Sequence, residues 1–516
     1  MLRFILTLCL LVTYPLHVNA AKINAEGAQK LKQILQDNLD YQKTVNESFG
    51  SVSVTYEGEL VVEQKDGFYK ATFPHIKLTT PEHLKGAQNF ILDIGVITLN
   101  AMPGEKPGIW KTTLAIPPKI TMSEGAESEQ LDVTFGEQKV IGLLDERLGY
   151  FTKINMQLNN ITATLDGEDL GVLFGGIQFY QNMEEKEPTK YSGKGHITLS
   201  NIDIRPPEEE GKIVLDEFKV NYAMGEAVLP TLKSYQEKLL SHAETFKGLA
   251  MMDETGNPSS VDGEALVDMI FDLYDFDMKS FSFGYSLKNL NIDEPNSEPV
   301  KIGAASIELG LDGLGSETGA IYIKSSGRDM PVELGDDEIE AMMPSISQIM
   351  IRSENIPYNT LATLADTSIR SIVEKPETSQ MIGLGLMMRL PGILAQADTK
   401  VIVEDSYIGN DMYNVSVNGT ILTDLAAMGG FSATSNVLFE GMDALQSALT
   451  THSTSESIFA QSSADAADFL GKLKSIGSKK KSENGKNAYS FDIKTTPEGG
   501  VLVNEQDPMA VLFATE

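Results

Sequence analysis

The strongest constraint on the fold of this chain is an alternation of apolar and polar residues that recurs along most of its length. In residues 51–64, Val52, Val54 and Tyr56 alternate with serine and threonine, and a second apolar run follows Gly58, which predicts a hairpin. Successive side chains of a strand point to opposite faces, so the alternation predicts antiparallel sheet with one covered face and one wet face. The same pattern recurs in residues 90–99, 112–122, 131–135, 153–165, 194–204, 212–222, 281–287, 305–311 and 321–323.

Helical periodicity interrupts the alternating segments. Apolar residues recur at spacings of three and four, the pattern of an amphipathic helix, in residues 26–45, 230–252, 262–274 and 463–476. Acidic residues at 336–338 complement the positive end of a helix dipole, so we expect a helix over residues 336–351. Asn159 and Asn160 separate two alternating runs that use different faces, which predicts a bulge or turn.

These patterns predict an α+β fold dominated by antiparallel β-sheet, with amphipathic helices packed on one face or capping the ends. Three helix-then-strand stretches suggest repeated helix-hairpin units, although chance similarity of such common patterns is the alternative. A loop rich in Gly, Pro, Asn and Ser supports a boundary between a β-rich N-terminal half with a leading helix, 21–252, and an α+β C-terminal half, 253–516. The three stretches are 30–45 with 51–64, 264–274 with 280–293, and 463–476 with 487–503.

Residues 1–20 have the three parts of a secretory signal peptide. Arg3 precedes a short apolar run, and small residues at Val18 and Ala20 suit cleavage after Ala20. The only cysteine, Cys9, lies in this segment, so the processed chain is expected to hold no disulfide and no thiolate metal site. We expect export to a bacterial periplasm, with secretion as the alternative, and no transmembrane span after cleavage.

The charge balance excludes one class of partner. The chain has 41 Lys and Arg against 73 Asp and Glu, a net charge of −32. Such a surface repels phosphate backbones, so nucleic-acid binding is not expected. We identify no catalytic, cofactor-binding or metal-ligating residues, because no motif has the spacing and local context that such chemistry requires. The chain is therefore expected not to be an enzyme and to need no cofactor.

Two segments are candidate binding sites. Residues 381–394 are apolar without clear alternation, which suits either a buried core segment or the adaptable wall of a groove for an acyl chain. Lys479, Lys480 and Lys481 form the only basic cluster of an acidic chain, either as a solvated loop or as a contact for an anionic headgroup or an acidic partner. The candidate groove residues are Met381, Ile382, Leu384, Leu386, Met387, Met388 and Ile393.

The C-terminal quarter carries a resemblance. It lies in three segments, namely residues 413–420, the helical segment 442–449 after Val437, Leu438 and Phe439, and the closing hairpin 489–504. These segments resemble an uncharacterised family of alphaproteobacterial envelope proteins, known as a domain of unknown function. Helix-capped repeats of alternating strands are more distantly similar to the AsmA-like envelope proteins. That resemblance implies lipid handling at the outer membrane. The short cleavable signal departs from the lasting N-terminal membrane helix of AsmA-like proteins and puts a membrane-bridging role in doubt.

We therefore expect an exported, non-enzymatic protein that binds or carries an apolar or lipid-like ligand in the cell envelope. The alternative is a structural or interaction protein that binds other envelope proteins through its sheet edges and acidic surface.

Overall fold

The computed structural model of the chain describes residues 23–49, 53–79, 90–124, 130–205, 211–229, 232–245, 263–274, 277–294, 299–330, 335–428, 430–482 and 485–512. The predicted signal peptide, Cys9 and the loop 253–260 lie outside these residues. The chain divides into two compact units. Unit 1 comprises the described residues of Met1–Met278 and Asp293–Ser297, and unit 2 those of Lys279–Ile292 and Glu298–Glu516.

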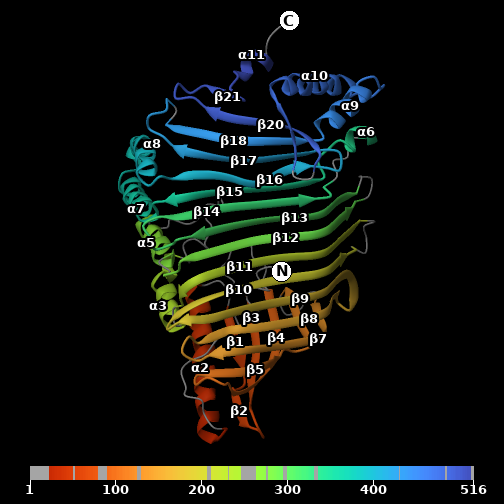
Figure 1. Cartoon of the computed structure of the whole chain (residues 1–516). Coiled ribbons are helices and arrows are strands. Elements are labelled where there is room, and N and C mark those ends of the chain that lie inside the picture. Colours follow the sequence, from red (N-terminus) through yellow and green to blue (C-terminus); the bar gives the residue numbers. More distant parts are fainter. Residues whose placement is uncertain are drawn as a thin grey trace. The chain divides into compact units, whose positions relative to one another are not determined.

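Unit 1 is built on antiparallel strands, as the alternation predicts. β3 pairs with β4, which pairs along its length first with β6 and then with β5, and both of these pair with β7. From β7 to β11 each strand pairs with the next, and Figure 1 shows these five side by side. The strands are β1 (Ser53–Glu57), β2 (Val61–Gln64), β3 (Tyr69–Thr79), β4 (Phe90–Pro103), β5 (Ile109–Ala115), β6 (Lys119–Glu124), β7 (Gln130–Asp145), β8 (Tyr150–Leu165), β9 (Glu168–Glu187), β10 (Lys190–Ile204) and β11 (Lys212–Val228).

The leading helix of unit 1 completes its core. α2 (Ala25–Phe49) buries Leu31, Leu35 and Leu39, which recur every four residues and so form one stripe of the helix. This stripe belongs to the same core as Trp110, whose ring packs edge-on against Tyr69 with centroids 5.9 Å apart. The amphipathic helix predicted over residues 26–45 is confirmed, and so is the helix over residues 262–274, which is α5 (Gly263–Tyr274). α3 (Leu232–Ser241) forms the described part of the helix expected from residue 230.

The hairpin predicted within residues 51–64 is wrong. β1 pairs with residues 75–79 of β3, and β2 pairs with residues 69–72 of the same strand. The short segment at Gly58 therefore carries the chain from one half of β3 to the other, and it does not turn β2 back onto β1. Sequence alternation identifies the two strands but not their partner, because it reports which face of a strand is buried and not which strand lies beside it.

At Asn160 the set of β8 side chains that faces the core shifts by one residue, and this shift occurs without the predicted bulge. The register with β7 is the same before and after Asn160: Asn159 pairs with Glu137, and Ile161 pairs with Phe135. Asn160 has a left-handed backbone, φ 52°, so that Leu158 and Ile161 both point into the core. Gly136 lies opposite, and a Cβ there would approach the Asn160 Cβ to 2.9 Å. Asn201 of β10 has the same left-handed backbone, with φ 49°, and the register of β10 with both of its neighbours is also unbroken there.

Unit 2 is also an antiparallel ladder, in which each strand from β12 to β18 pairs with the next and β18 pairs with β20. β19 and β21 pair with β20. The strands are β12 (Ser280–Asp293), β13 (Val300–Asp312), β14 (Gly319–Arg328), β15 (Ile346–Ile356), β16 (Lys400–Gly409), β17 (Asn414–Thr423), β18 (Phe431–Glu440), β19 (Ser478–Lys481), β20 (Asn487–Thr495) and β21 (Val501–Val503).

Helices lie at the edges and one end of this ladder. Figure 1 shows α7 and α8 beside one edge, and α9 and α10 near β18 and β20. The helices are α6 (Asp337–Glu340), α7 (Tyr358–Glu374), the 3-10 turn η1 (Pro376–Thr378), α8 (Ser379–Gln396), α9 (Met442–His452), α10 (Ala460–Ile476) and α11 (Pro508–Leu512).

The helix predicted over residues 336–351 is wrong beyond its first turn. Asp336 does cap α6, accepting hydrogen bonds from the backbone N–H groups of Glu338 and Ile339. The helix ends at Glu340, and Pro344 precedes the strand β15. Ile349 and Ile351 lie on one face of β15, with Gln348, Met350 and Arg352 on the other, so the segment after Pro344 has the period of two of a strand.

The structure does not form repeated helix-hairpin units. Only the C-terminal member has the expected parts, with α10 followed by the hairpin of β20 and β21. In the first member both strands pair with β3, and in the second member residues 280–293 are the single strand β12. The similarity between the three stretches is therefore local.

The left-handed Asn160 predicts a specific loss of stability. Asn160→Val should lower the unfolding free energy of unit 1 by about 1 to 2 kcal/mol, because a β-branched residue disfavours positive φ. Asn160→Gly should cost less. Denaturant unfolding followed by the fluorescence of Trp110, the single tryptophan of the chain, reports on unit 1. Equal unfolding midpoints for the Val and Gly variants would contradict this account.

Candidate functional site

The cross-strand register of unit 2 collects aliphatic side chains on one face of its sheet, which we call the apolar face. Directly paired residues of antiparallel strands point to the same side. Ile323 of β14 pairs with Leu309 of β13 and with Ile351 of β15, and Ile351 pairs with Val403 of β16. The apolar face comprises Phe281, Phe283, Tyr285, Ile307, Leu309, Leu311, Ile321, Ile323, Ile349, Ile351, Val401, Val403 and Ile421.

The apolar face is open over β13–β17 and covered at its C-terminal end. Seven of its aliphatic side chains are 37% to 49% exposed, namely those of Ile307, Leu309, Ile321, Ile323, Ile349, Ile351 and Ile421. Farther along the same face, Phe439 and Phe491 are only 8% and 3% exposed, because they pack with Met442 of α9 and Leu470 of α10. The helices thus form a conventional second layer over one end, and the aliphatic side chains beyond it keep large contact with solvent.

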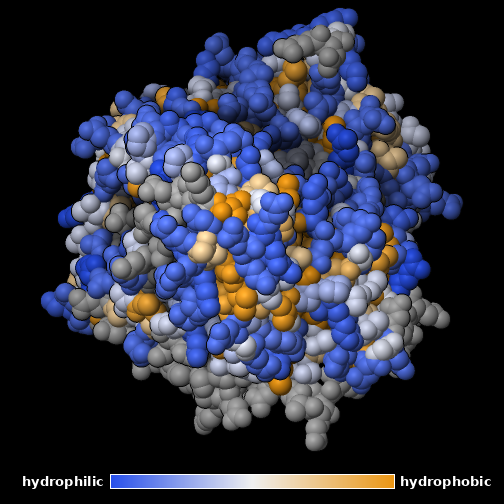
Figure 2. Space-filling model, turned by 90° about the horizontal axis from the view of Figure 1, so that it is seen from below, coloured by the Kyte–Doolittle hydropathy of each residue, from blue (hydrophilic) through white to orange (hydrophobic). Residues whose placement is uncertain are grey.

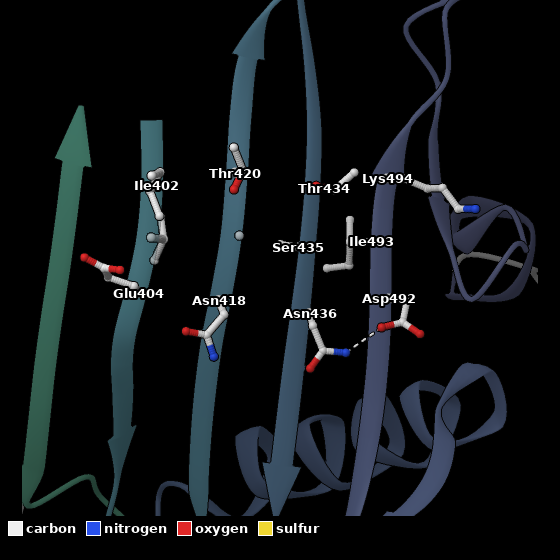
Figure 3. A pocket seen from close by; sticks show the side chains of 12 residues that line it. Ile402, Glu404, Asn418, Thr420, Thr434, Ser435, Asn436, Asp492, Ile493 and Lys494 are labelled. Carbon is white, nitrogen blue, oxygen red and sulfur yellow. Dashed lines mark hydrogen bonds between the residues drawn. The ribbon is translucent and has the colours of Figure 1, made fainter. Parts of the chain in front are cut away.

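The opposite face of the same strands is polar. It carries Glu308 of β13 and Lys324 of β14, and near the C-terminal end it forms a shallow hollow of about 590 Å³. Figure 3 shows Glu404, Asn418, Asn436 and Asp492 along this hollow, where the Asn436 amide donates to Asp492. Ile402 and Ile493 also line this hollow, so its surface is mixed in polarity.

Exposed apolar side chains are also visible in the space-filling view of the surface (Figure 2). The face of the molecule in Figure 2 is mainly hydrophilic and has a cluster of hydrophobic residues near its middle. Patches of this kind, enclosed by polar residues, mark binding surfaces more often than scattered single residues do.

The predicted groove residues 381–394 form the helix α8, and the structure splits them between two sides. Ile382, Leu386 and Ile393 are half-buried. Met381, Leu384, Met387 and Met388 point outward and are 62% to 83% exposed. The segment is therefore not a fully buried core element, and a groove for an acyl chain along it stays a prediction.

The three lysines of the predicted basic loop lie in a strand, so the prediction of a loop is wrong. Lys479 pairs with Tyr489 and Lys480 with Ala488, and strand alternation sends their side chains to opposite faces. The Lys479 Nζ lies 5.8 Å from the centre of the Tyr489 ring, and the Lys480 Nζ donates to the Ser490 hydroxyl at 3.1 Å. The three ammonium groups do not converge on one point, and an anion contact here stays a prediction.

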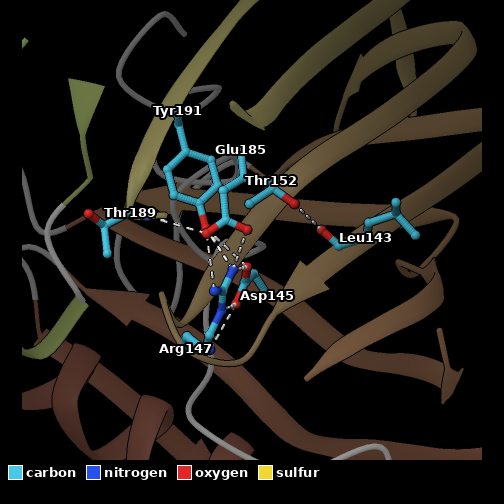
Figure 4. A network of polar contacts seen from close by, with 7 residues as sticks. All are labelled: Leu143, Asp145, Arg147, Thr152, Glu185, Thr189 and Tyr191. Carbon is cyan, nitrogen blue, oxygen red and sulfur yellow. Dashed lines mark hydrogen bonds and ion pairs between the residues drawn. The ribbon is translucent and has the colours of Figure 1, made fainter. Parts of the chain in front are cut away.

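A polar cluster in unit 1 is the most densely bonded charged group that the described residues contain (Figure 4). The Arg147 guanidinium donates to buried Asp145 at 2.7 and 3.1 Å, to Glu185 at 3.1 and 3.2 Å, and to the Tyr191 hydroxyl at 2.9 Å. This guanidinium holds the pKa of Glu185 below its ordinary value. Burial is the main cause of the raised pKa of Tyr191.

The cluster joins the β7–β8 turn to the facing ends of β9 and β10. A hollow of about 610 Å³ lies beside it, and two of its three lining lysines form ion pairs: Lys111 with Glu105 at 2.9 Å and Lys153 with Glu184 at 3.5 Å. Because Arg147 is already shared between two carboxylates, it is not poised to bind a substrate anion. We interpret the cluster as a structural clamp.

A second cluster in unit 2 has the composition of a catalytic triad but not its geometry. The His452 Nδ1 lies 2.9 Å from the Ser463 hydroxyl, and its Nε2 lies 2.9 Å from Asp336. In a serine hydrolase the serine bonds to Nε2 and the aspartate to Nδ1, and the hydroxyl is accessible. Here that order is reversed, and Ser463 is only 2% exposed. The cluster instead connects α9, α10 and the cap of α6, across 116 residues of sequence.

Two further searches concern the described residues alone. Within them no three His, Cys, Asp or Glu side chains are arranged to hold a metal ion. Among the described helices none is long and apolar enough to cross a membrane.

Comparison of the chain with protein-family models, curated proteins and solved structures finds no match in any of the three. Support for the apolar face as a binding surface therefore comes from its geometry alone. Sequence analysis identifies many of its residues as one side of alternating strands. It did not recognise them as a site, because each strand was expected to have a covered face and the missing cover is visible only in three dimensions.

The His452 cluster predicts a change of stability in acid. The pKa of Asp336 is lowered to about 2, mainly by the hydrogen bond from Ser457 and next by the hydrogen bond from His452. An unfolded aspartate titrates near ~3.9, so ionised Asp336 stabilises the fold above about pH 4, and this contribution is lost as the pH falls through about 2. Melting temperatures of the native protein and Asp336→Asn should differ at pH 5 and converge near pH 2. A difference that is independent of pH would contradict this role.

Proposed function

We propose that this protein binds the acyl chain of a lipid-like ligand along the apolar face of unit 2. One observation carries the proposal: neighbouring strands from β13 to β17 present aliphatic side chains that are more than a third exposed. A strand face of this kind normally packs against a second layer. Water contact with so many aliphatic groups is unfavourable, and a hydrocarbon chain lying across the strands removes part of that contact.

The dimensions of the apolar face suit a hydrocarbon chain. From β12 to β17 there are five inter-strand steps of ~4.8 Å, a row of roughly 24 Å. The hydrocarbon of one bilayer leaflet is about 15 Å thick, half of a ~30 Å core. One acyl chain therefore fits across the strands. Contact with the sheet on one side recovers part of the ~0.8 kcal/mol that full burial of each methylene gives.

The chemistry of the apolar face favours a chain over a polar ligand. The side chains that line it are mainly Ile, Leu and Val, which offer dispersion contacts and no hydrogen bonds. The polar groups of the same strands lie on the opposite face, at Glu308, Lys324 and Asn418. With a chain net charge of −32, an uncharged or zwitterionic headgroup is favoured over an anionic one.

The proposal includes no chemical step. We place the protein in the periplasm on the signal pattern of residues 1–20, and we propose a binding or carrier role without catalysis. Recognition of other envelope proteins through sheet edges stays a prediction.

Substitution on the apolar face should weaken ligand binding. Ile323 and Ile351 are direct cross-strand partners, and threonine keeps their β-branched shape. The double variant Ile323→Thr/Ile351→Thr should bind monomeric palmitoyl-lysophosphatidylcholine about tenfold more weakly, because it removes apolar contact area worth ~1.4 kcal/mol. Displacement of the neutral fluorescent probe N-phenyl-1-naphthylamine measures the affinity.

Met350→Thr is the matched control, since Met350 lies on β15 between Ile349 and Ile351 and points to the opposite face. Its affinity should equal that of the native protein. Equal loss in both variants, or no binding by the native protein, would overturn the proposal.

A further inference from the structure

The helix α8 leaves apolar side chains uncovered along its outer side. These side chains are the strongly exposed ones described above, and their spacing of three and four residues places them on one side of the helix. They belong to Met381, Leu384, Met387 and Met388. Arg389 is the only charged residue among the eighteen of α8. A helix that is apolar on all sides is ordinarily buried, and α8 is half-buried on its inner side only.

The helix pair α7–α8 is an insertion between neighbouring strands. β15 ends at Ile356 and β16 begins at Lys400, and the two strands are antiparallel partners. A short turn suffices for such a connection, so the sheet itself does not require the two helices. Their sequence is free to serve another purpose.

Other exposed apolar residues lie at the same edge of the sheet. Lys400 pairs with Leu422, so the loop that follows β17 leaves the sheet where α8 enters it. In this loop Leu425 and Met428 are strongly exposed. The aliphatic residues of the apolar face also lie near this edge, since Ile321 is two residues from the start of β14.

We propose that α8, with the loop carrying Leu425 and Met428, inserts into the surface of a lipid bilayer. This inference deepens the proposed function and rests on it for the nature of the ligand: the bilayer is the source or acceptor of the acyl chain. The insertion places the edge of unit 2 nearest the apolar face at the membrane surface. α8 forms its backbone hydrogen bonds within the helix, as entry into a lipid interface requires, except at its ends and at Pro391, which has no N–H to donate to the Met387 carbonyl.

The residues on α8 favour a lipid surface over a protein partner. Specific protein interfaces carry a hydrogen bond for every ~100 to 200 Å² and a polar rim. Methionine and leucine make up most of the outward side of α8, where the exposed polar residues are Gln380, Arg389 and Gln396. The methionine and leucine side chains do not hold a partner in a fixed orientation by hydrogen bonds. Flexible methionine side chains adapt well to disordered acyl chains. Because the chain is strongly acidic and α8 has a single cation, attraction to anionic lipid is not the driving force, and the match is to zwitterionic lipid.

Flotation with phosphatidylcholine vesicles tests this inference. The native protein should float with the vesicles equally at low and high salt, because the attraction is hydrophobic. Met387→Ser/Met388→Ser should reduce vesicle partitioning at least tenfold, since two large side chains lose contact with hydrocarbon. Met509→Ser, at an exposed methionine of α11, is the matched control and should float like the native protein.

Two further measurements separate this inference from the proposed function. Met387→Ser/Met388→Ser should keep full affinity for monomeric lysophosphatidylcholine, whereas Ile323→Thr/Ile351→Thr should lose that affinity and still float. Absence of flotation, or flotation unchanged by the α8 substitutions, overturns the membrane inference. Light scattering that shows a dimer dissociated by the same substitutions, without vesicle binding, overturns it in favour of a second copy as the occupant of α8.

Discussion

The exposure of one sheet face in unit 2 is the physical constraint on which this account depends. Antiparallel pairing without a change of side aligns the aliphatic residues of successive strands, so each of them adds to the same surface. In unit 1 the residues on the inner side of β8, such as Leu158, are enclosed by a common core with α2. In unit 2 α9 and α10 provide such cover only near β18 and β20. We propose that an acyl chain supplies the contact that the rest of this face lacks.

Polar clusters hold each unit together around these apolar surfaces. Arg147 neutralises Asp145 and Glu185 at one turn of unit 1, and His452 links Asp336 to Ser463 in unit 2. Breaking such a buried group leaves an unpaired charge or donor, which costs more than the intact cluster contributes. Both clusters have partners for their charged groups within the protein, which explains why residues typical of catalysis here have a structural role.

Sequence periodicity predicted most strands and the main helices because it reports which side of each element is apolar. It placed β8 and α5 closely, but it could not supply strand partners, and so the supposed hairpin of residues 51–64 is wrong. The helix expected over residues 336–351 failed because the dipole argument concerns only its first turn. Residues 381–394 show no clear alternation, and their helical form and outward methionines depend on packing that no periodicity reveals.

Photocrosslinking with a lysophosphatidylcholine that carries a diazirine in its acyl chain tests the central claim most directly. Peptide mapping identifies the strand and the side chain that the acyl chain touches. This account predicts crosslinks at Ile307, Leu309, Ile323 and Ile351, and few on the opposite face of the same strands. Crosslinks confined to unit 1, or distributed equally over both faces of the unit 2 sheet, would contradict it.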